Sequence, residues 1–217
     1  MCYEETKEAT ELLNNDTVQL ILINEFPPYE KELNKLLTES NVQLRLIASM
    51  HGEGSCLRAV MDSVINERFG SDFRTKILNE AGSLFLESNK DSIFQEQQLD
   101  KRPTLASNSG VNGQDEIIKR LNSKFSNDDT IELISNIVNS PYFKVKFKVS
   151  TDGTSSNAEI IERNSTDDFT ELERIIINEI NGLTDWTAGQ IRNESVSSTI
   201  EIAIAVNKKR NANKTYE

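Results

Sequence analysis

The segment from Tyr142 to Val149 constrains the fold more than any other part of the sequence, because its apolar and basic side chains alternate strictly. Successive side chains of a strand point to opposite faces of a sheet. The alternation therefore predicts a strand with one buried face and one face in water. The residues of the two faces are Phe143, Val145, Phe147 and Val149 on the first, and Lys144, Lys146 and Lys148 on the second.

The elements after this strand follow in a regular order. Thr151–Gly153 predicts a tight turn in which glycine supplies a positive φ, and Ser156–Glu162 predicts the return strand of a hairpin. A helix with one apolar side is expected over Asp168–Asn181, closed by Gly182. The last alternating segment, Val196–Val206, predicts a final strand. A strand hairpin, a helix and a further strand form a compact α+β unit.

The residues before this unit are predicted to be mostly helical. Helical spacing of apolar residues occurs at about 4–14, 29–38, 60–69, 73–85, 114–125 and 128–138. Two short apolar runs, Val18–Ile23 and Val42–Ile47, fit a buried helix turn and a strand equally well. We therefore predict an α+β fold with three parts: a mostly helical region of unknown role over 1–97, an α+β domain with a small antiparallel sheet packed on helices over 98–207, and a basic disordered tail over 208–217.

The charge and hydropathy of the chain exclude two classes of function. The 217 residues carry a net charge of −11, whereas proteins that bind nucleic acid through phosphate contacts need clustered lysine and arginine. No apolar run approaches the roughly 18–20 residues that a membrane-spanning helix needs. We therefore expect no nucleic-acid partner and no membrane-spanning helix.

The two cysteines, Cys2 and Cys56, are far apart in the sequence and predict neither a disulfide framework nor a zinc site. Cys56 precedes the apolar run that begins at Leu57, which favours a buried core thiol. Cys2 stands at the start of a polar stretch, where the lipid-bearing cysteine of a bacterial lipoprotein would stand. A single acyl chain there would be a weak membrane anchor.

No pattern in the sequence predicts catalysis, a metal site or a cofactor. With a single histidine, neither a histidine-rich metal site nor a zinc-protease helix can form. His51 and Cys56 could form a nucleophilic pair, but no third group supports it. The carboxylate pairs Asp128-Asp129 and Asp167-Asp168 precede predicted helices, where capping is their expected role. We predict no catalytic residue, no metal ligand and no cofactor.

The second half of the chain resembles the TonB C-terminal domain family. The features that carry this resemblance occur in the family's order: the alternating strand Lys144–Val149 with the Asp152-Gly153 turn, the second strand Ala158–Thr166, the helix Leu172–Ile180, and Trp186 followed by Gly189. Upstream, Leu99–Pro103 resembles the lead-in of many Bacteroidetes members. The pattern departs from the family where Ala188 replaces a usual proline.

The resemblance implies a non-enzymatic protein of the periplasm or cell envelope that binds an extended peptide, for instance from a TonB-dependent outer-membrane transporter. In such binding the peptide adds to a strand edge through backbone hydrogen bonds. The expected binding residues lie on the last strand and at the tryptophan: Val196, Ser198, Ile200, Ile202, Ile204 and Trp186.

Two alternatives accompany this interpretation. The last strand could instead be closed by homodimerisation or covered by the N-terminal helices, which would make the protein a structural or assembly module. Trp186 could be a core residue over the helix or a peptide contact. Apart from a lipid on Cys2, nothing in the sequence attaches the chain to a membrane.

Overall fold

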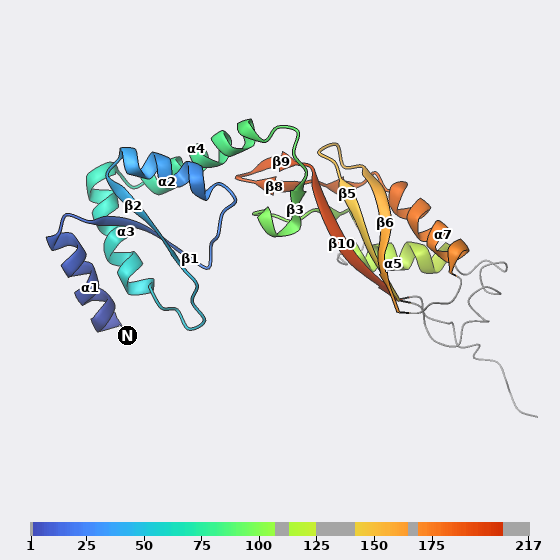
Figure 1. Cartoon of the computed structure of the whole chain (residues 1–217), viewed down its shortest axis with the longest axis horizontal. Coiled ribbons are helices and arrows are strands. Elements are labelled where there is room, and N and C mark those ends of the chain that lie inside the picture. The colour runs from blue at the N-terminus through green and yellow to red at the C-terminus, as the bar shows by residue number, and fades with distance from the viewer. Residues whose placement is uncertain (1, 107–112, 125–141, 165–168, 206–217) are drawn as a thin grey trace, which may run out of the picture. The chain divides into compact units, whose positions relative to one another are not determined.

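The computed structural model of the chain describes residues 2–106, 113–124, 142–164 and 169–205. These residues form an α+β fold, as the sequence predicts, in two compact units, Met1–Asp91 and Ser92–Glu217 (Figure 1). The second unit begins a few residues before the predicted boundary at residue 98, because Phe94 and Gln95 pair with its sheet. The predicted helix at 128–138 and the predicted tail at 208–217 lie outside the described residues.

The first unit contains a parallel strand pair with helices on both faces. Its elements are α1 (Cys2–Asn14), β1 (Val18–Ile23), α2 (Glu30–Glu39), β2 (Val42–Ile47), α3 (Ser55–Phe69) and α4 (Phe73–Ser88). The two ambiguous apolar runs are β1 and β2, which pair in parallel from Val18 opposite Val42 to Ile23 opposite Ile47. The mostly helical character of this region is confirmed. Periodicity alone does not decide whether these two runs are strands or helix turns, because six-residue apolar runs have no distinctive period.

Helices α1 and α3 pack on the face of β1 that carries Ile21. Ala9 of α1 meets Leu57 and Met61 of α3 in this core, with Leu12 and Leu13 packed against it. Helix α2 contacts β2 and α4. The Arg74 guanidinium of α4 donates to the Ile21 carbonyl at 3.0 Å and pairs with Asp62 of α3 at 3.1 Å. One arginine thus joins α3 and α4 to the outer edge of β1.

The second unit is built on a four-stranded sheet with the order β3-β10-β5-β6. Its elements are β3 (Phe94–Gln95), η1 (Glu96–Gln98), β4 (Thr104–Leu105), α5 (Gly113–Lys124), β5 (Tyr142–Val149), β6 (Ser155–Arg163), α7 (Thr170–Asn181), β7 (Trp186–Thr187), β8 (Gly189–Ile191), β9 (Glu194–Val196) and β10 (Ser198–Ala205). Strand β5 pairs antiparallel with both β6 and β10, and β3 is parallel to β10. The predicted small antiparallel sheet is therefore present, extended by one short parallel strand.

Helices α5 and α7 cover the same face of this sheet (Figure 1). The core beneath them contains the apolar side of β5, and its members are Ile117, Leu121, Phe143, Val145, Phe147, Val149, Leu172, Ile176 and Ile180, together with other apolar residues of the unit. All four apolar residues of β5 are at most 1% exposed. The prediction drawn from the alternation of Tyr142–Val149 is confirmed.

The β5–β6 turn rests on the backbone next to Trp186. Gly153 has a φ of +83° and accepts a hydrogen bond from the Trp186 amide at 3.1 Å. A Cβ atom at this position would lie 2.5 Å from the Trp186 carbonyl oxygen. Glycine is therefore required twice here, for its positive φ and for this close approach.

We expect Gly153→Ala to destabilise the second unit by about 3 kcal/mol, since it adds a backbone clash to the strain of a positive φ. The matched control is Gly52→Ala, whose φ is +82° and whose Cβ would meet nothing within 4 Å. This control should lose about 1 kcal/mol. Urea unfolding followed by circular dichroism compares the two variants, and Trp186, the sole tryptophan, reports on the second unit. Equal losses would show that the turn does not press on Trp186.

Candidate functional site

The predicted final strand, Val196–Val206, is divided in the structure. Val196 ends β9, which pairs with β8 through a turn at Arg192 and Asn193 whose φ values are +50° and +67°. After Ser197 the chain begins β10 at Ser198. The single strand predicted over this range is therefore wrong at its start, because residues 194–196 pair locally in a hairpin and not in the main sheet.

Strand β10 has a neighbour on each side. Along its whole length it pairs with β5, and at Ser198 and Thr199 it also pairs with β3. The Phe94 amide donates to the Ser197 carbonyl at 2.9 Å, and the Thr199 hydroxyl donates to the Phe94 carbonyl at 3.4 Å. The β10 edge, as we call the side of β10 that faces β3, thus already holds an extended segment of the chain.

The backbone N–H and C=O groups of successive residues of β10 point alternately toward β5 and toward β3. This alternation determines which residues can form hydrogen bonds at the β10 edge. Because the Ser197 carbonyl faces β3, residues with the same parity, such as Thr199 and Glu201, turn their backbone groups toward this edge. Ser198 and Ile200 have the opposite parity and turn theirs toward β5. An added strand would therefore bond to Thr199 and Glu201 and not to the residues between them.

The residues predicted from the sequence lie in the core of the unit. Their exposed fractions are 6% for Val196, 0% for Ser198, 6% for Ile200, 8% for Ile202 and 1% for Ile204. Of these, Ile200, Ile202 and Ile204 pack in the core beneath α5 and α7, and none of the five side chains is turned toward solvent. The side chains of Thr199 and Glu201 are on the opposite, outer face, where β10 is partly exposed.

Trp186 takes the first of its two predicted roles, that of a core residue. It is 7% exposed, its ring centroid lies 5.6 Å from that of Phe147, and β7 pairs it with Leu105 of β4. Its indole nitrogen has no hydrogen-bond partner in the described part of the chain. The short β4–β7 pair that holds it was not predicted, because two-residue strands have no period.

On the outer face of the sheet, the lysines of β5 lie between two glutamates of β6 and one glutamate of β10. Lys144 lies opposite Glu162 of β6, and Lys146 lies between Glu159 of β6 and Glu201 of β10. Lys144 and Glu201 form an ion pair at 2.6 Å. The hydrogen bond from Lys144 lowers the pKa of Glu201 and, in turn, raises the pKa of Lys144. This face is balanced in charge, which does not favour a strongly charged ligand.

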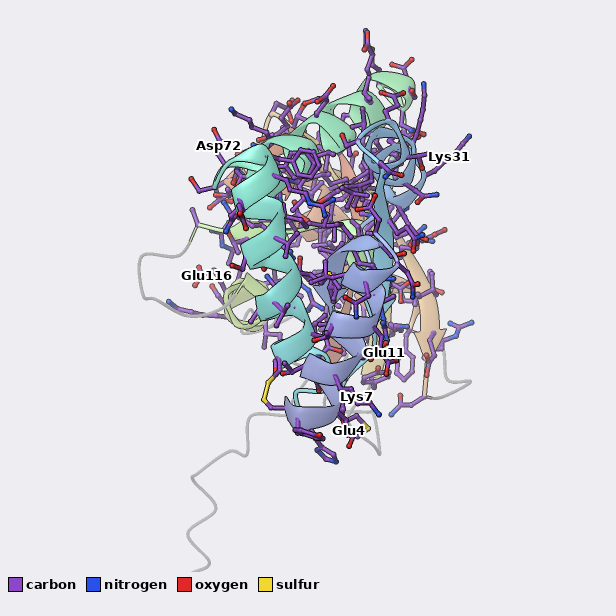
Figure 2. The ribbon with its side chains drawn as sticks, turned by 90° about the vertical axis from the view of Figure 1, so that its left-hand side faces the viewer. Glu4, Lys7, Glu11, Lys31, Asp72 and Glu116 are labelled. Atoms are coloured by element: carbon purple, nitrogen blue, oxygen red, sulfur yellow. A yellow bond between two sulfur atoms is a disulfide. The ribbon has the colours of Figure 1, made fainter. Side chains whose placement is uncertain are left out.

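In the first unit, Cys2 and Cys56 form a disulfide with a Cα–Cα distance of 5.4 Å, drawn in yellow in Figure 2. The expectation of a free, buried Cys56 thiol is wrong, because packing of α1 on α3 brings the two helix starts together. A sulfur in a disulfide cannot also carry a thioether-linked lipid, so the lipid considered for Cys2 would require this bond to be absent. The disulfide also leaves Cys56 without a free thiol, so Cys56 cannot act as a nucleophile while the bond is closed.

Glu5 of α1 caps the first turn of α3. Its carboxylate accepts hydrogen bonds from the amides of Gly54, Cys56 and Leu57 at 3.0, 2.8 and 3.2 Å. Gly54, at the N-cap position, has no side chain to do so. These backbone hydrogen bonds lower the pKa of Glu5, and the bond from the Gly54 amide has the largest effect. Local sequence patterns do not predict this contact, because it joins residues about fifty positions apart.

An open hollow of about 540 Å³ adjoins Glu5 at the end of β2. Most of its charged lining is engaged: Glu8 pairs with Arg45 at 2.6 Å, and Glu53 bonds to Ser49 and to the His51 amide. Glu4 also lines the hollow and, like Lys7 and Glu11 of the same helix, is exposed (Figure 2). One solvated carboxylate is too little to select a ligand, so the hollow does not define a binding site.

Two further features are absent from the described residues. No group of three or more histidine, cysteine, aspartate or glutamate side chains there is placed to hold a metal ion. In the same residues, no helix is both long enough and apolar enough to cross a membrane.

The fold and the β10 edge define an α+β protein with a four-stranded mixed sheet covered by helices on one face. No family model and no curated protein matches the chain. Among solved structures, the solution structure of the Helicobacter pylori TonB C-terminal domain matches with 19% identity and a TM-score of 0.30, and the match covers 48% of this chain and 90% of that one. A likeness at this TM-score shows neither the family nor the function of this chain.

We expect the Glu5 carboxyl to titrate below its ordinary value of 4.5. Because the pKa is lowered in the folded state, the stabilisation is fully present above pH 4.5 and is lost as the pH falls through the folded pKa. A carboxyl-detected NMR titration measures this midpoint. In Glu5→Gln, the pH dependence of stability in this range should be smaller than in the wild type. A Glu5 midpoint at or above 4.5 would contradict the capping contact.

Proposed function

We propose that the second unit binds an extended segment of a partner protein, which adds as a strand at the β10 edge, and that the protein acts in the bacterial cell envelope without catalysing a reaction. The observation that carries this proposal is the pairing of β3 with β10. At this edge β3 lies opposite Ser198 and Thr199, and the Ser197 carbonyl accepts a backbone hydrogen bond from the Phe94 amide. Strand addition needs an edge of this kind, and it derives its affinity from the main chain.

The competing segment is short, which favours exchange. Strand β3 contributes two paired residues, and its anchor is the buried side chain of Phe94, which is 4% exposed. A net gain of about 0.5–1.5 kcal/mol per backbone hydrogen bond lets a longer peptide compete with so short a strand. We therefore propose that the partner displaces β3 and pairs with β10 at Thr199 and Glu201.

The envelope location and the partner class rest on two further features. The order of hairpin, helix, tryptophan loop and last strand is the order on which the resemblance to TonB C-terminal domains is based. That resemblance implies a TonB-dependent outer-membrane transporter as the partner. The Cys2–Cys56 disulfide fits a compartment outside the cytosol, since such bonds persist mainly in oxidising surroundings.

We expect Glu201→Pro to weaken binding of an extended transporter-derived peptide at least about tenfold, because proline removes a backbone donor from the β10 edge. The matched control Glu201→Ala removes the same side chain and its ion pair with Lys144, keeps the amide, and should bind nearly as the wild type does. NMR titration of isotope-labelled protein measures both affinities, and the spectra of the free variants check the fold. Equal affinities for the two variants would contradict binding at this edge.

Assembly through the same edge is the alternative function. Sedimentation over a range of concentrations distinguishes the two, because an assembly module would form a dimer that Glu201→Pro disrupts and Glu201→Ala does not. A monomer that binds no peptide would reject both functions.

We expect Phe94→Ala to tighten peptide binding several-fold, since it removes the anchor of the competing strand. The control is Ile93→Ala, which alters the neighbouring side chain, itself 46% exposed. Calorimetric titration of both variants measures the difference, and Trp186 fluorescence verifies that the second unit is folded. Weaker binding by a folded Phe94→Ala variant would mean that β3 supports the partner and does not compete with it.

A further inference from the structure

We propose that the Cys2–Cys56 disulfide is a reversible thiol–disulfide exchange site, opened by a dithiol reductant that attacks the Cys2 sulfur. The site lies in the first unit and does not depend on the proposed peptide binding. Its bond joins the first residue of α1 to the second residue of α3.

The two sulfurs differ in how they can be reached. Cys2 is exposed at the beginning of α1, whereas Cys56 is half-buried in the first turn of α3. Exchange requires an in-line approach of the attacking thiolate to one sulfur, so access selects between them. Because Cys2 is the more exposed residue, attack at its sulfur is favoured, and Cys56 is then the leaving group.

The position of Cys56 suits it to leave as a thiolate. Helix N-termini stabilise anions, and thiols placed there have a lowered pKa. The same turn demonstrably holds an anion, because the amides of Gly54, Cys56 and Leu57 all donate to the Glu5 carboxylate. The charge of Glu5 partly offsets this effect, which limits the stability of the open thiolate and favours closure of the bond.

The bond changes balance with a dithiol as the reductant. Its first thiolate attacks the Cys2 sulfur, which forms a mixed disulfide and breaks the bond to Cys56, and Cys56 leaves as a thiolate and takes a proton from water. The second thiolate of the reductant attacks its own sulfur in the mixed disulfide. The reductant thereby closes its internal disulfide, Cys2 is released and protonated, and two electrons have passed to the cysteine pair.

The contacts that remain after reduction keep the two thiols close. The second half of α1 stays packed through Ala9, Leu12 and Leu13, and Glu8 still pairs with Arg45. Because these contacts, and the hydrogen bonds from α3 to Glu5, do not involve the sulfurs, opening the bond leaves α1 packed on α3. An oxidised dithiol can then restore the bond, so the site can cycle.

Reduction of the full-length protein without denaturant tests the proposal. Dithiothreitol is added over a range of concentrations, the thiols are trapped with a maleimide, and the two tryptic peptides are weighed by mass spectrometry. We expect both cysteines to become labelled at a rate proportional to the dithiothreitol concentration, with an unchanged circular dichroism spectrum. Oxidised dithiothreitol should reverse the labelling.

Glutathione identifies the attacked sulfur when the reaction is quenched early with a maleimide, because a monothiol cannot close an internal disulfide and its first product is the mixed disulfide. We expect the adduct on Cys2, and an adduct on Cys56 would overturn the assignment. The double variant Cys2→Ser/Cys56→Ser should keep the native spectrum and take up no label. Reduction that proceeds only in denaturant, or that unfolds the wild-type protein, would show a purely structural disulfide and reject the proposal, whether or not the double variant folds.

Discussion

The apolar face of β5 is the contact on which the second unit depends. Its four apolar side chains are enclosed by α5 and α7, and its backbone is paired on both sides, to β6 and to β10. A shift of the register by one residue would turn the lysines of the outer face into this core and the phenylalanines into water. The sheet order, the position of α7 and the location of the β10 edge all follow from this one strand being central and fixed in register.

Local periodicity was enough to predict the elements that have one. Three such elements are present: the strand Tyr142–Val149, the hairpin with its Gly153 turn, and the helix closed by Gly182. Each buries one face, and the spacing of its apolar residues shows which face that is. Strands β3, β4 and β7 could not be predicted in this way. Each has two residues, so each exists only through a pairing with a segment distant in the sequence.

The candidate site shows a related limit of sequence reasoning. Hydrophobic alternation located the last strand and drew attention to Ile200, Ile202 and Ile204, yet these residues are conspicuous because they are core residues. A strand edge is a property of the backbone, and the residues that serve it here, Thr199 and Glu201, have unremarkable side chains. The disulfide was missed for a similar reason, since the proximity of Cys2 and Cys56 is created by packing of α1 on α3.

The capping of α3 by Glu5 has a consequence for how the chain is made. On the ribosome α1 emerges before α3, and the amides that its Glu5 carboxylate must meet follow about fifty residues later. Until then α1 has neither its hydrophobic neighbour nor its hydrogen-bond donors, and when α3 emerges its first turn still lacks a cap of its own. The two helices therefore complete each other only after α3 has been made, and α1, although made earlier, does not reach its final place before then.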